Sequence, residues 1–175
     1  SNAFSASGQA IPRKNLAAFS LATGALVNSW QADAAGAVRA LTSDGTWLFV
    51  GGNFSKVGTT LRARVAKVNV ATAQVDQTFS ASFDSTVRTL ALSGSSLFVG
   101  GAFTTANGVP KSHLAKIDAT TGGLDTGFAA TANNAVYSLR VAPGGVIYAA
   151  GNFSTLNGVA RSGIGAVTAS TGVAN

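Results

Sequence analysis

Short apolar runs separated by polar turns return at a fixed spacing along the chain. The run Trp47–Phe54 ends in Gly-Gly-Asn-Phe, and related runs occupy Ser96–Phe103 and Val146–Phe153. The aromatic residues that close these runs, with a fourth near the amino end, are 50, 49 and 50 residues apart; they are Phe4, Phe54, Phe103 and Phe153. A period of this size is typical of propeller blades or of another stacked repeat unit.

Each apolar run predicts a short β-strand, because it is brief and is bounded by Gly, Asp, Ser or Thr. In the first repeat we expect strands at Leu16–Leu21, Val38–Leu41 and Trp47–Phe54. The turn Ser43–Gly45 contains Asp-Gly, which favours a hairpin since Gly accepts the positive φ of such turns. The equivalent runs of the later repeats are Val65–Val68, Val87–Leu90, Leu114–Ile117, Val136–Leu139 and Ile164–Val167. No stretch has a helical apolar period long enough to predict a helix.

About four strands fit in each repeat, which predicts an all-β fold: a β-propeller built from four-stranded blades of roughly 50 residues, with about three and a half blades in this chain. A parallel β-helix is the second choice, because it needs a shorter rung of roughly 20 to 30 residues. Residues 1–3 are interpreted as the remnant of an expression tag. The rest forms a single propeller segment with repeats at 4–53, 54–102, 103–152 and a partial repeat at 153–175.

Two further repeat positions predict how blades pack together. The glycine pair Gly51-Gly52 falls inside an expected strand, where neighbouring backbones would approach too closely for side chains. Trp30, Phe79 and Phe128 are each 49 residues apart, so we expect all three to be buried between blades.

Composition narrows the classes of function. Of the 175 residues 46% are apolar and only 10% charged, and no apolar run reaches the roughly 18 to 20 residues of a membrane-spanning helix, so no membrane insertion is expected. Cysteine is absent, which excludes a disulfide framework or a thiolate metal site. The net charge of +6 comes from basic residues scattered singly, which favours a sparsely charged surface over a nucleic-acid site.

A family resemblance is carried by the second and third repeats. Gly100–Phe103, Asn107–Lys111, Leu114-Ala115 and Thr121–Phe128 together form the pattern Gly-Gly-x-Phe, Asn-Gly-Val-x-Lys, Leu-Ala and Thr-Gly-x-x-Asp-x-x-Phe. This pattern resembles the uncharacterised bacterial propeller repeat of the delta-sixty type, which has a kelch-like blade length. The resemblance covers nearly the whole chain, although Ala149–Gly151 blurs the glycine pair. It implies an exported or surface-attached bacterial protein and no particular chemistry.

The sequence contains few residues of the types that form catalytic sites. The only imidazole, His113, takes the repeat position that holds Asn15, Arg64 and Gly163 elsewhere, which indicates a surface position beside a strand. The six Asp residues fall at one repeat position or in turns, where Asp commonly bonds backbone amides. No loop gathers the oxygen ligands that calcium needs. We therefore expect no catalytic residue, no metal and no cofactor.

Two sets of side chains are the candidate ligand-binding residues. One is a row of cations that follows the repeat phenylalanine at a constant spacing and would form an arc on one face of the blades: Arg13, Arg62, Lys111 and Arg161. Their recurrence equally favours a structural anchor in each blade. The other set shares one position of the expected inner strand and differs in type between blades, which makes it the better ligand candidate: Arg39, Arg88 and Tyr137.

The sequence therefore favours a non-enzymatic binding or scaffold module that recognises a glycan, polymer or protein. The alternative is a polysaccharide lyase or hydrolase at the mouth of the propeller channel, which would need two carboxylates roughly 5 to 10 Å apart. A featureless spacer is a third possibility. Three blades are too few for a closed ring of about four to eight, so we expect a homodimer in which two chains complete six to seven blades.

Overall fold

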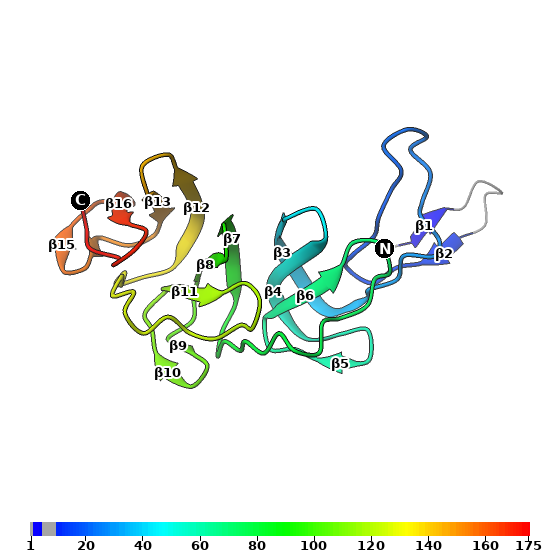
Figure 1. The fold of residues 1–175 in the computed structure, drawn as a ribbon, viewed down its shortest axis with the longest axis horizontal. Helices are drawn as coiled ribbons and strands as arrows, with labels where there is room; N and C mark the ends of the chain where they lie inside the picture. Colours follow the sequence, from blue (N-terminus) through cyan, green and yellow to red (C-terminus); the bar gives the residue numbers. More distant parts are fainter. Residues whose placement is uncertain (1, 5–9) are drawn as a thin grey trace.

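The chain forms three main antiparallel sheets that follow one another in sequence order, together with smaller two-stranded hairpins (Figure 1). The computed structural model describes residues 2–4 and 10–175, and their regular structure is entirely β-strand. We call the three sheets blades 1, 2 and 3. Their main strands are β3 (Ala34–Ser43), β4 (Trp47–Val57) and β6 (Val65–Asn69) in blade 1, β7 (Val87–Ser93), β8 (Ser96–Gly101) and β11 (Leu114–Asp118) in blade 2, and β12 (Val136–Ala142), β13 (Val146–Gly151) and β16 (Ile164–Thr168) in blade 3.

Each blade has the same strand order, and the fourth strand is reduced to a single bridge. In blade 2 the order is β7, β8, β11, and Ile117 of β11 bridges Leu124 outside it. The equivalent bridges join Val68 to Val75 and Val167 to Ala174. The prediction of an all-β fold is thus confirmed, and the chain contains three blades, each with three main strands and a fourth reduced to one bridge.

The outer half of a further blade precedes blade 1. Phe19 bridges Leu26, the counterpart of the bridge that closes each complete blade. Leu26 is therefore at the fourth-strand position of this half blade. Asn2 and Ala3, which the sequence assigns to a tag remnant, belong to β1 (Asn2–Phe4), which pairs with β2 (Ala10–Pro12).

Short hairpins connect the second and third strands of every blade. They are formed by the end of β4 with β5 (Thr60–Leu61), by β9 (Thr105–Ala106) with β10 (Val109–Pro110), and by β14 (Thr155–Leu156) with β15 (Val159–Ala160). Asn107 and Asn157 at two of these turns have a φ of 50°, which Asn tolerates better than most residues.

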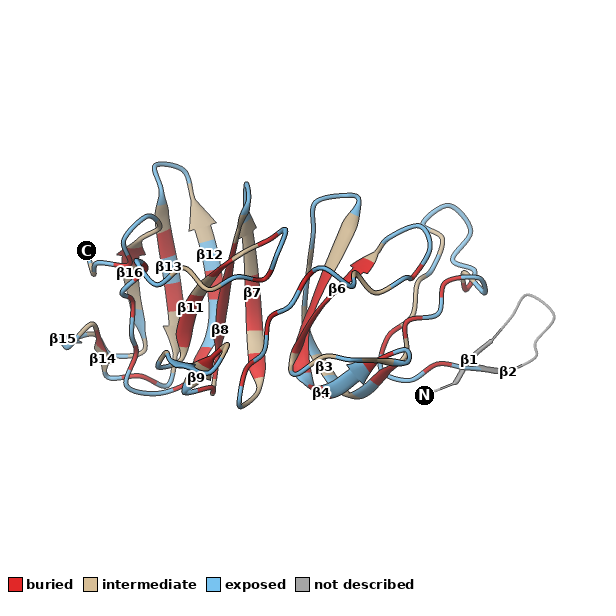
Figure 2. Cartoon of the chain, turned by 60° about the horizontal axis from the view of Figure 1, so that its bottom comes forward, coloured by how far each residue is buried: buried red, intermediate tan, exposed pale blue. Residues whose placement is uncertain are grey.

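The core lies between the blades (Figure 2). Phe49 of blade 1 meets Phe79 with ring centroids 5.9 Å apart, and Phe98 of blade 2 meets Phe128 at 5.6 Å, both edge to face. Phe79 and Phe128 are fully buried and Trp30 is 5% exposed, which confirms the predicted burial of this aromatic position. Edge-to-face pairs add about 0.5 to 1.5 kcal/mol beyond the area they bury.

Glycine is required where one blade meets the next. A Cβ added to Gly51 would lie 2.6 Å from Val87 Cγ1, and one added to Gly100 would lie 2.8 Å from Val136 Cγ1. These distances are too short for real Cβ contacts, so the glycines allow neighbouring blades to pack closely, as the sequence predicts. Among the described residues no helix is long and apolar enough to cross a membrane.

Candidate functional site

The three candidate residues of the inner strands sit at β-bulges. In each inner strand the pairing register shifts by one residue, between Val38 and Ala40, between Val87 and Thr89, and between Val136 and Ser138. The extra residues are Arg39, Arg88 and Tyr137. A bulge interrupts the ladder and re-aims the side chain of its extra residue, and bulges are common beside functional sites. We call these three residues the bulge row.

Two members of the bulge row contact each other across a blade boundary. The guanidinium carbon of Arg88 lies 4.9 Å from the centroid of the Tyr137 ring, within the range of a cation–π interaction. Tyr137 is 45% exposed. The adjacent strands are tied together below this pair, because the Leu139 amide donates a buried hydrogen bond of 3.1 Å to Thr89 Oγ1. This bond joins the two strands that carry Arg88 and Tyr137.

Arg88 has no carboxylate partner in the part of the chain that the structure describes. Both ion pairs found there involve lysine, and Arg88 Nε is buried without a hydrogen-bond partner. Arg39 occupies the same bulge in blade 1 and is exposed. The bulge row thus offers two cations and an exposed aromatic face to an anionic or ring-shaped ligand.

The arc of recurring cations makes contacts of another kind. Each of the three arginines donates to the carbonyl of the preceding residue and to a carbonyl 14 or 15 residues later, namely Asn28 for Arg13, Asp76 for Arg62 and Asn175 for Arg161. Lys111 Nζ donates to Phe128 O at 2.5 Å. These bonds tie the short hairpins to the segment that follows the fourth strand, as expected of a structural anchor. A ligand-binding role for the arc stays a prediction.

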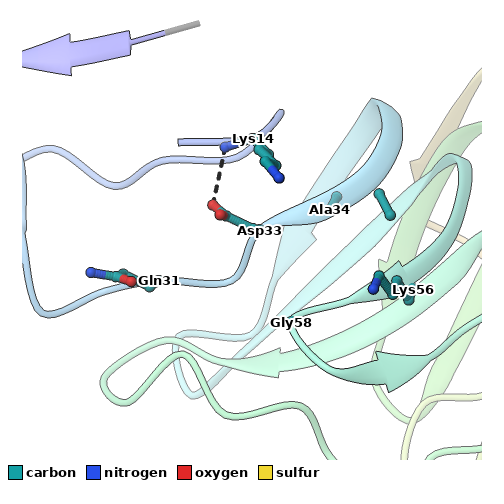
Figure 3. Close-up of a pocket in the computed structure, with 7 residues that line it drawn as sticks. Lys14, Gln31, Asp33, Ala34, Lys56 and Gly58 are labelled. Atoms are coloured by element: carbon teal, nitrogen blue, oxygen red, sulfur yellow. Dashed lines mark hydrogen bonds between the residues drawn. The ribbon is translucent and has the colours of Figure 1, made fainter. Parts of the chain in front are cut away.

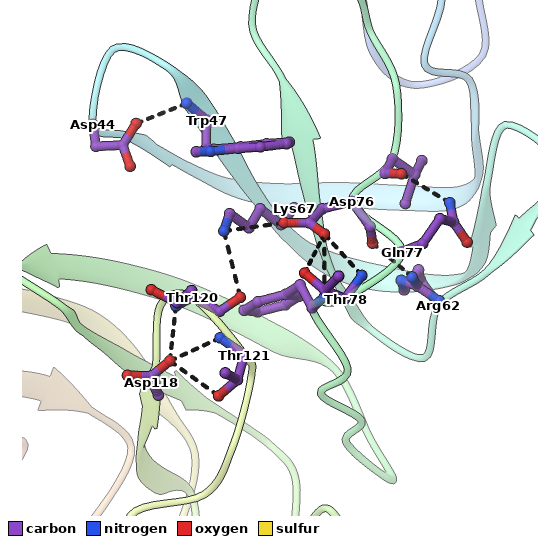
Figure 4. Close-up of polar contacts among 12 residues, drawn as sticks. Asp44, Trp47, Arg62, Lys67, Asp76, Gln77, Thr78, Asp118, Thr120 and Thr121 are labelled. Atoms are coloured by element: carbon purple, nitrogen blue, oxygen red, sulfur yellow. Dashed lines mark hydrogen bonds and ion pairs between the residues drawn. The ribbon is translucent and has the colours of Figure 1, made fainter.

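Lys67 forms a polar clasp between blades 1 and 2 (Figure 4). Its Nζ lies 3.1 Å from Asp76 Oδ2 and 3.5 Å from Thr120 O in the next blade. The same atom lies 4.7 Å from the centroid of the Trp47 ring, and the Lys67 side chain is only 6% exposed. Blade 2 repeats the ion pair in a more open setting, with Lys116 Nζ 2.9 Å from Asp125 Oδ2.

The described carboxylates act as acceptors in turns or as ion-pair partners. Burial alone would raise the pKa of Asp76, but hydrogen bonds from Thr78 and Lys67 outweigh it and lower that pKa to about 2. Backbone amides or a lysine likewise lower the pKa of Asp44, Asp118 and Asp125. Asp84 accepts from the Thr104 and Thr105 amides, and from Thr104 Oγ1 at 2.6 Å, which also lowers its pKa. A general acid in glycoside hydrolysis needs the opposite, a raised pKa.

His113 has a structural place. It adopts a φ of 67°, and the residues at its repeat position, Asn15, Arg64 and Gly163, also have positive φ values between 64° and 76°. His113 Nδ1 donates to Ala132 O at 2.9 Å, as Asn15 Nδ2 does to Ala34 O at 3.0 Å. The His113 side chain thus forms a hydrogen bond with the segment that leads into blade 3. No group of three or more potential metal ligands occurs among residues 2–4 and 10–175.

An open hollow of about 320 Å³ lies at the start of blade 1 (Figure 3). Lys14, Gln31, Asp33 and Lys56 contribute its polar lining, and the Lys14 amide donates to Asp33 Oδ1 at 3.0 Å. None of the predicted site residues lines it. Asp33 is therefore engaged with the chain and does not face a second carboxylate in this hollow.

Sequence reasoning missed the Lys67 clasp and the Thr89 bond. A signal for the clasp was present, because Lys67 and Lys116 each precede an aspartate by nine residues, at Asp76 and Asp125. The Thr89 side chain accepts the hydrogen bond from the Leu139 amide, but the equivalent residues in the other blades are Ala40 and Ser138. Because threonine does not recur at this position, the sequence gives no repeated signal for the bond.

Comparison with known proteins supports the fold. Residues 96–128, from β8 to Phe128, match the model of a β-propeller domain of unknown function, DUF5122. The chain is a β-propeller segment. The crystal structure of the computationally designed protein Ika8 is similar, with a TM-score of 0.55, 14% identity and 79% of this chain covered. The match spans 35% of Ika8, and at this identity it speaks for the fold alone. No curated protein matches the chain.

Proposed function

We propose that this propeller segment is a non-enzymatic binding or scaffold module, and that the bulge row is the surface that contacts its ligand. The observation that carries the proposal is the Arg88–Tyr137 pair, in which a cation without a carboxylate partner lies against a half-exposed aromatic ring. The terminal nitrogens of the arc arginines donate to backbone carbonyls, although the Nε atoms of Arg13 and Arg62 lack a partner, as that of Arg88 does. Among the described residues the Arg88 guanidinium makes no such bond to a carbonyl. A role in ligand contact accounts for the different state of Arg88.

The chemistry of the bulge row favours an acidic glycan or a similar anionic polymer. A guanidinium binds carboxylate or sulfate through paired hydrogen bonds, and an exposed tyrosine ring offers an apolar face to a sugar. Arg39 and Arg88 recur one blade apart, which suits a ligand whose charges also repeat. The resemblance of the repeats to bacterial surface proteins supports a location outside the cell or on its surface.

The state of the carboxylates supports binding over hydrolysis. Five aspartates have lowered pKa values and are held by amides, hydroxyls or lysines. Each would remain ionised near neutral pH and would be a poor proton donor to a glycosidic oxygen.

Binding of polygalacturonate, with neutral dextran as the comparison, tests the proposal by calorimetry at low and moderate salt. We expect Arg88→Ala and Tyr137→Ala each to weaken binding of the acidic polymer about tenfold. Arg140→Ala is the matched control, because Arg140 is an exposed arginine on the same strand β12 but outside the bulge. Equal losses in Arg88→Ala and Arg140→Ala would show nonspecific attraction. Absence of binding to any acidic polymer, or release of new reducing ends, would overturn the proposal.

A further inference from the structure

The last blade exposes positions that are buried in the other two. The residue that packs against the next blade is Phe49 in blade 1 and Phe98 in blade 2, at 0% and 1% exposure, whereas its counterpart Tyr148 in blade 3 is 50% exposed. In the third strand, Val65 and Leu114 are fully buried but Ile164 is 64% exposed. Blade 3 therefore carries an unpaired copy of the surface that joins the blades inside the chain.

The first blade lacks half of the complementary surface. Leu90 of blade 2 and Leu139 of blade 3 are buried against the blade that precedes them, while their counterpart Leu41 is 51% exposed. Among the described residues, this face of blade 1 is covered by the outer strands of a preceding blade, around Leu16 and Leu26. A hollow lined by Asn15–Ala17 and Val38–Leu41, of about 480 Å³, lies where the inner strands of that blade would pack.

We propose that these two surfaces bind each other in two copies of the chain, so that blade 3 of one copy packs against blade 1 of the other at both junctions of a closed ring. Both surfaces are further copies of the ones that already join blades 1 and 2 and blades 2 and 3 inside the chain. Three whole blades from each copy give a six-bladed ring, within the range of about four to eight that propellers use. Arg39 of the bulge row lines the hollow at this junction, but the association of the two copies does not require the ligand proposed for that row.

The outer strands at each junction are exchanged. The segment around Leu16–Leu26 of one copy and the segment Ile164–Ala174 of the other fill the same place in the repeat, so one of them gives way. In this exchange Ile164 becomes covered and Leu16, which is 7% exposed within one copy, becomes uncovered. The apolar surface buried by the third strand therefore stays nearly constant. The gain comes from the inner strands, where Tyr148 and Leu41 become buried.

Charge does not oppose the junction. The position of Lys67 and Lys116 is Ala166 in blade 3, so no lysine must be desolvated there. Arg140 pairs with Tyr148 across the strands and is exposed, and its long side chain can keep the guanidinium in solvent.

One residue sets the closeness of the fit. Ala150 takes the position of Gly51 and Gly100, where a Cβ would meet the valine of the next blade at 2.6 and 2.8 Å. Two copies must therefore stand slightly further apart than blades within a chain. Replacement of this methyl group by hydrogen should tighten the dimer.

Light scattering coupled to size exclusion, with sedimentation to obtain the dimer Kd, tests the inference on the 175-residue chain. We expect a dimer at micromolar concentration, weakened about tenfold or more by Tyr148→Asp and by Leu41→Asp, which lie on opposite sides of the junction. Both side chains are half exposed within one copy, so circular dichroism should show folded variants. Val109→Asp is the control, since Val109 is 41% exposed in the β9–β10 hairpin of blade 2.

The glycine variant gives the sharpest result. Ala150→Gly should lower the dimer Kd, because it restores the contact that Gly51 and Gly100 allow within the chain. A monomeric wild-type chain at concentrations well above micromolar overturns the proposal. So does a dimer whose Kd is unchanged by both aspartate variants, or one that Ala150→Gly fails to tighten.

Discussion

The Lys67–Asp76 clasp makes a pH-dependent contribution to stability that can be measured by replacing Asp76 with asparagine. The carboxylate side chain is 10% exposed and its ammonium partner 6%, so solvent screens the pair little. The pKa of Asp76 falls from 3.8 to about 2. A shift of this size corresponds to about 2 kcal/mol of stability at neutral pH. Because the variant also leaves Lys67 without a counter-charge, we expect a loss of about 2 to 4 kcal/mol.

The sign of the pH dependence follows from the lowered pKa. The contribution of Asp76 is fully present above the unfolded pKa near 4 and is lost as pH falls toward the folded pKa of about 2. Urea unfolding of wild type and Asp76→Asn, followed by circular dichroism at several pH values, should show a gap that is constant above about pH 5 and shrinks toward pH 2. Protonation of the other aspartates at low pH destabilises both proteins equally. The difference between their free energies of unfolding therefore reports on Asp76 alone.

The equivalent pair in blade 2 is the matched control. Lys116 and Asp125 are 2.9 Å apart, but the side chain of Asp125 is 37% exposed. Asp125→Asn should therefore cost less than Asp76→Asn, because solvent screens the open pair. A cost as large at Asp125 as at Asp76, or a gap for Asp76→Asn that stays constant down to pH 2, would refute this reasoning.

Three further predictions concern the framework. Lys111→Ala should lower the melting temperature, because it removes the hydrogen bond to Phe128 O, which contributes about 1 kcal/mol of stability. Binding of an acidic polymer should be unchanged. Abolished binding at unchanged stability would assign Lys111 to the ligand site. Thr89→Val should cost about 1 to 3 kcal/mol in urea unfolding, because it leaves the buried Leu139 amide without an acceptor; an unaltered midpoint would contradict this. In a Trp47→Phe background, Trp30 should emit as a buried indole and resist iodide, since it is 5% exposed; free quenching would disprove its burial.

The repeat pattern was sufficient for the fold because it records the local requirements of each strand and turn. Short apolar runs, a constant spacing and glycine at the strand positions of Gly51 and Gly100 predict the blades and their close contact. The burial of Trp30, Phe79 and Phe128 follows in the same way, since this aromatic position recurs at a constant spacing and is buried in all three repeats.

The candidate site could be located only in part. The shared position of Arg39, Arg88 and Tyr137 was visible, but the bulges that set them apart were not, since a bulge is a mismatch between two paired strands. The contact between Arg88 and Tyr137 joins residues 49 positions apart, and only the packing of adjacent blades decides it.

The sequence by itself determined the all-β class, the repeat length and the burial of the aromatic position at Trp30, Phe79 and Phe128, because these depend on local periodicity and on the side chain at each position. The tertiary structure alone decided that Lys67 spans two blades, that Leu41 and Tyr148 lie on open faces, and that Arg88 lacks a carboxylate partner among the described residues. These properties depend on which neighbour each blade has. Repeats of nearly equal sequence differ in exposure according to whether another blade covers them.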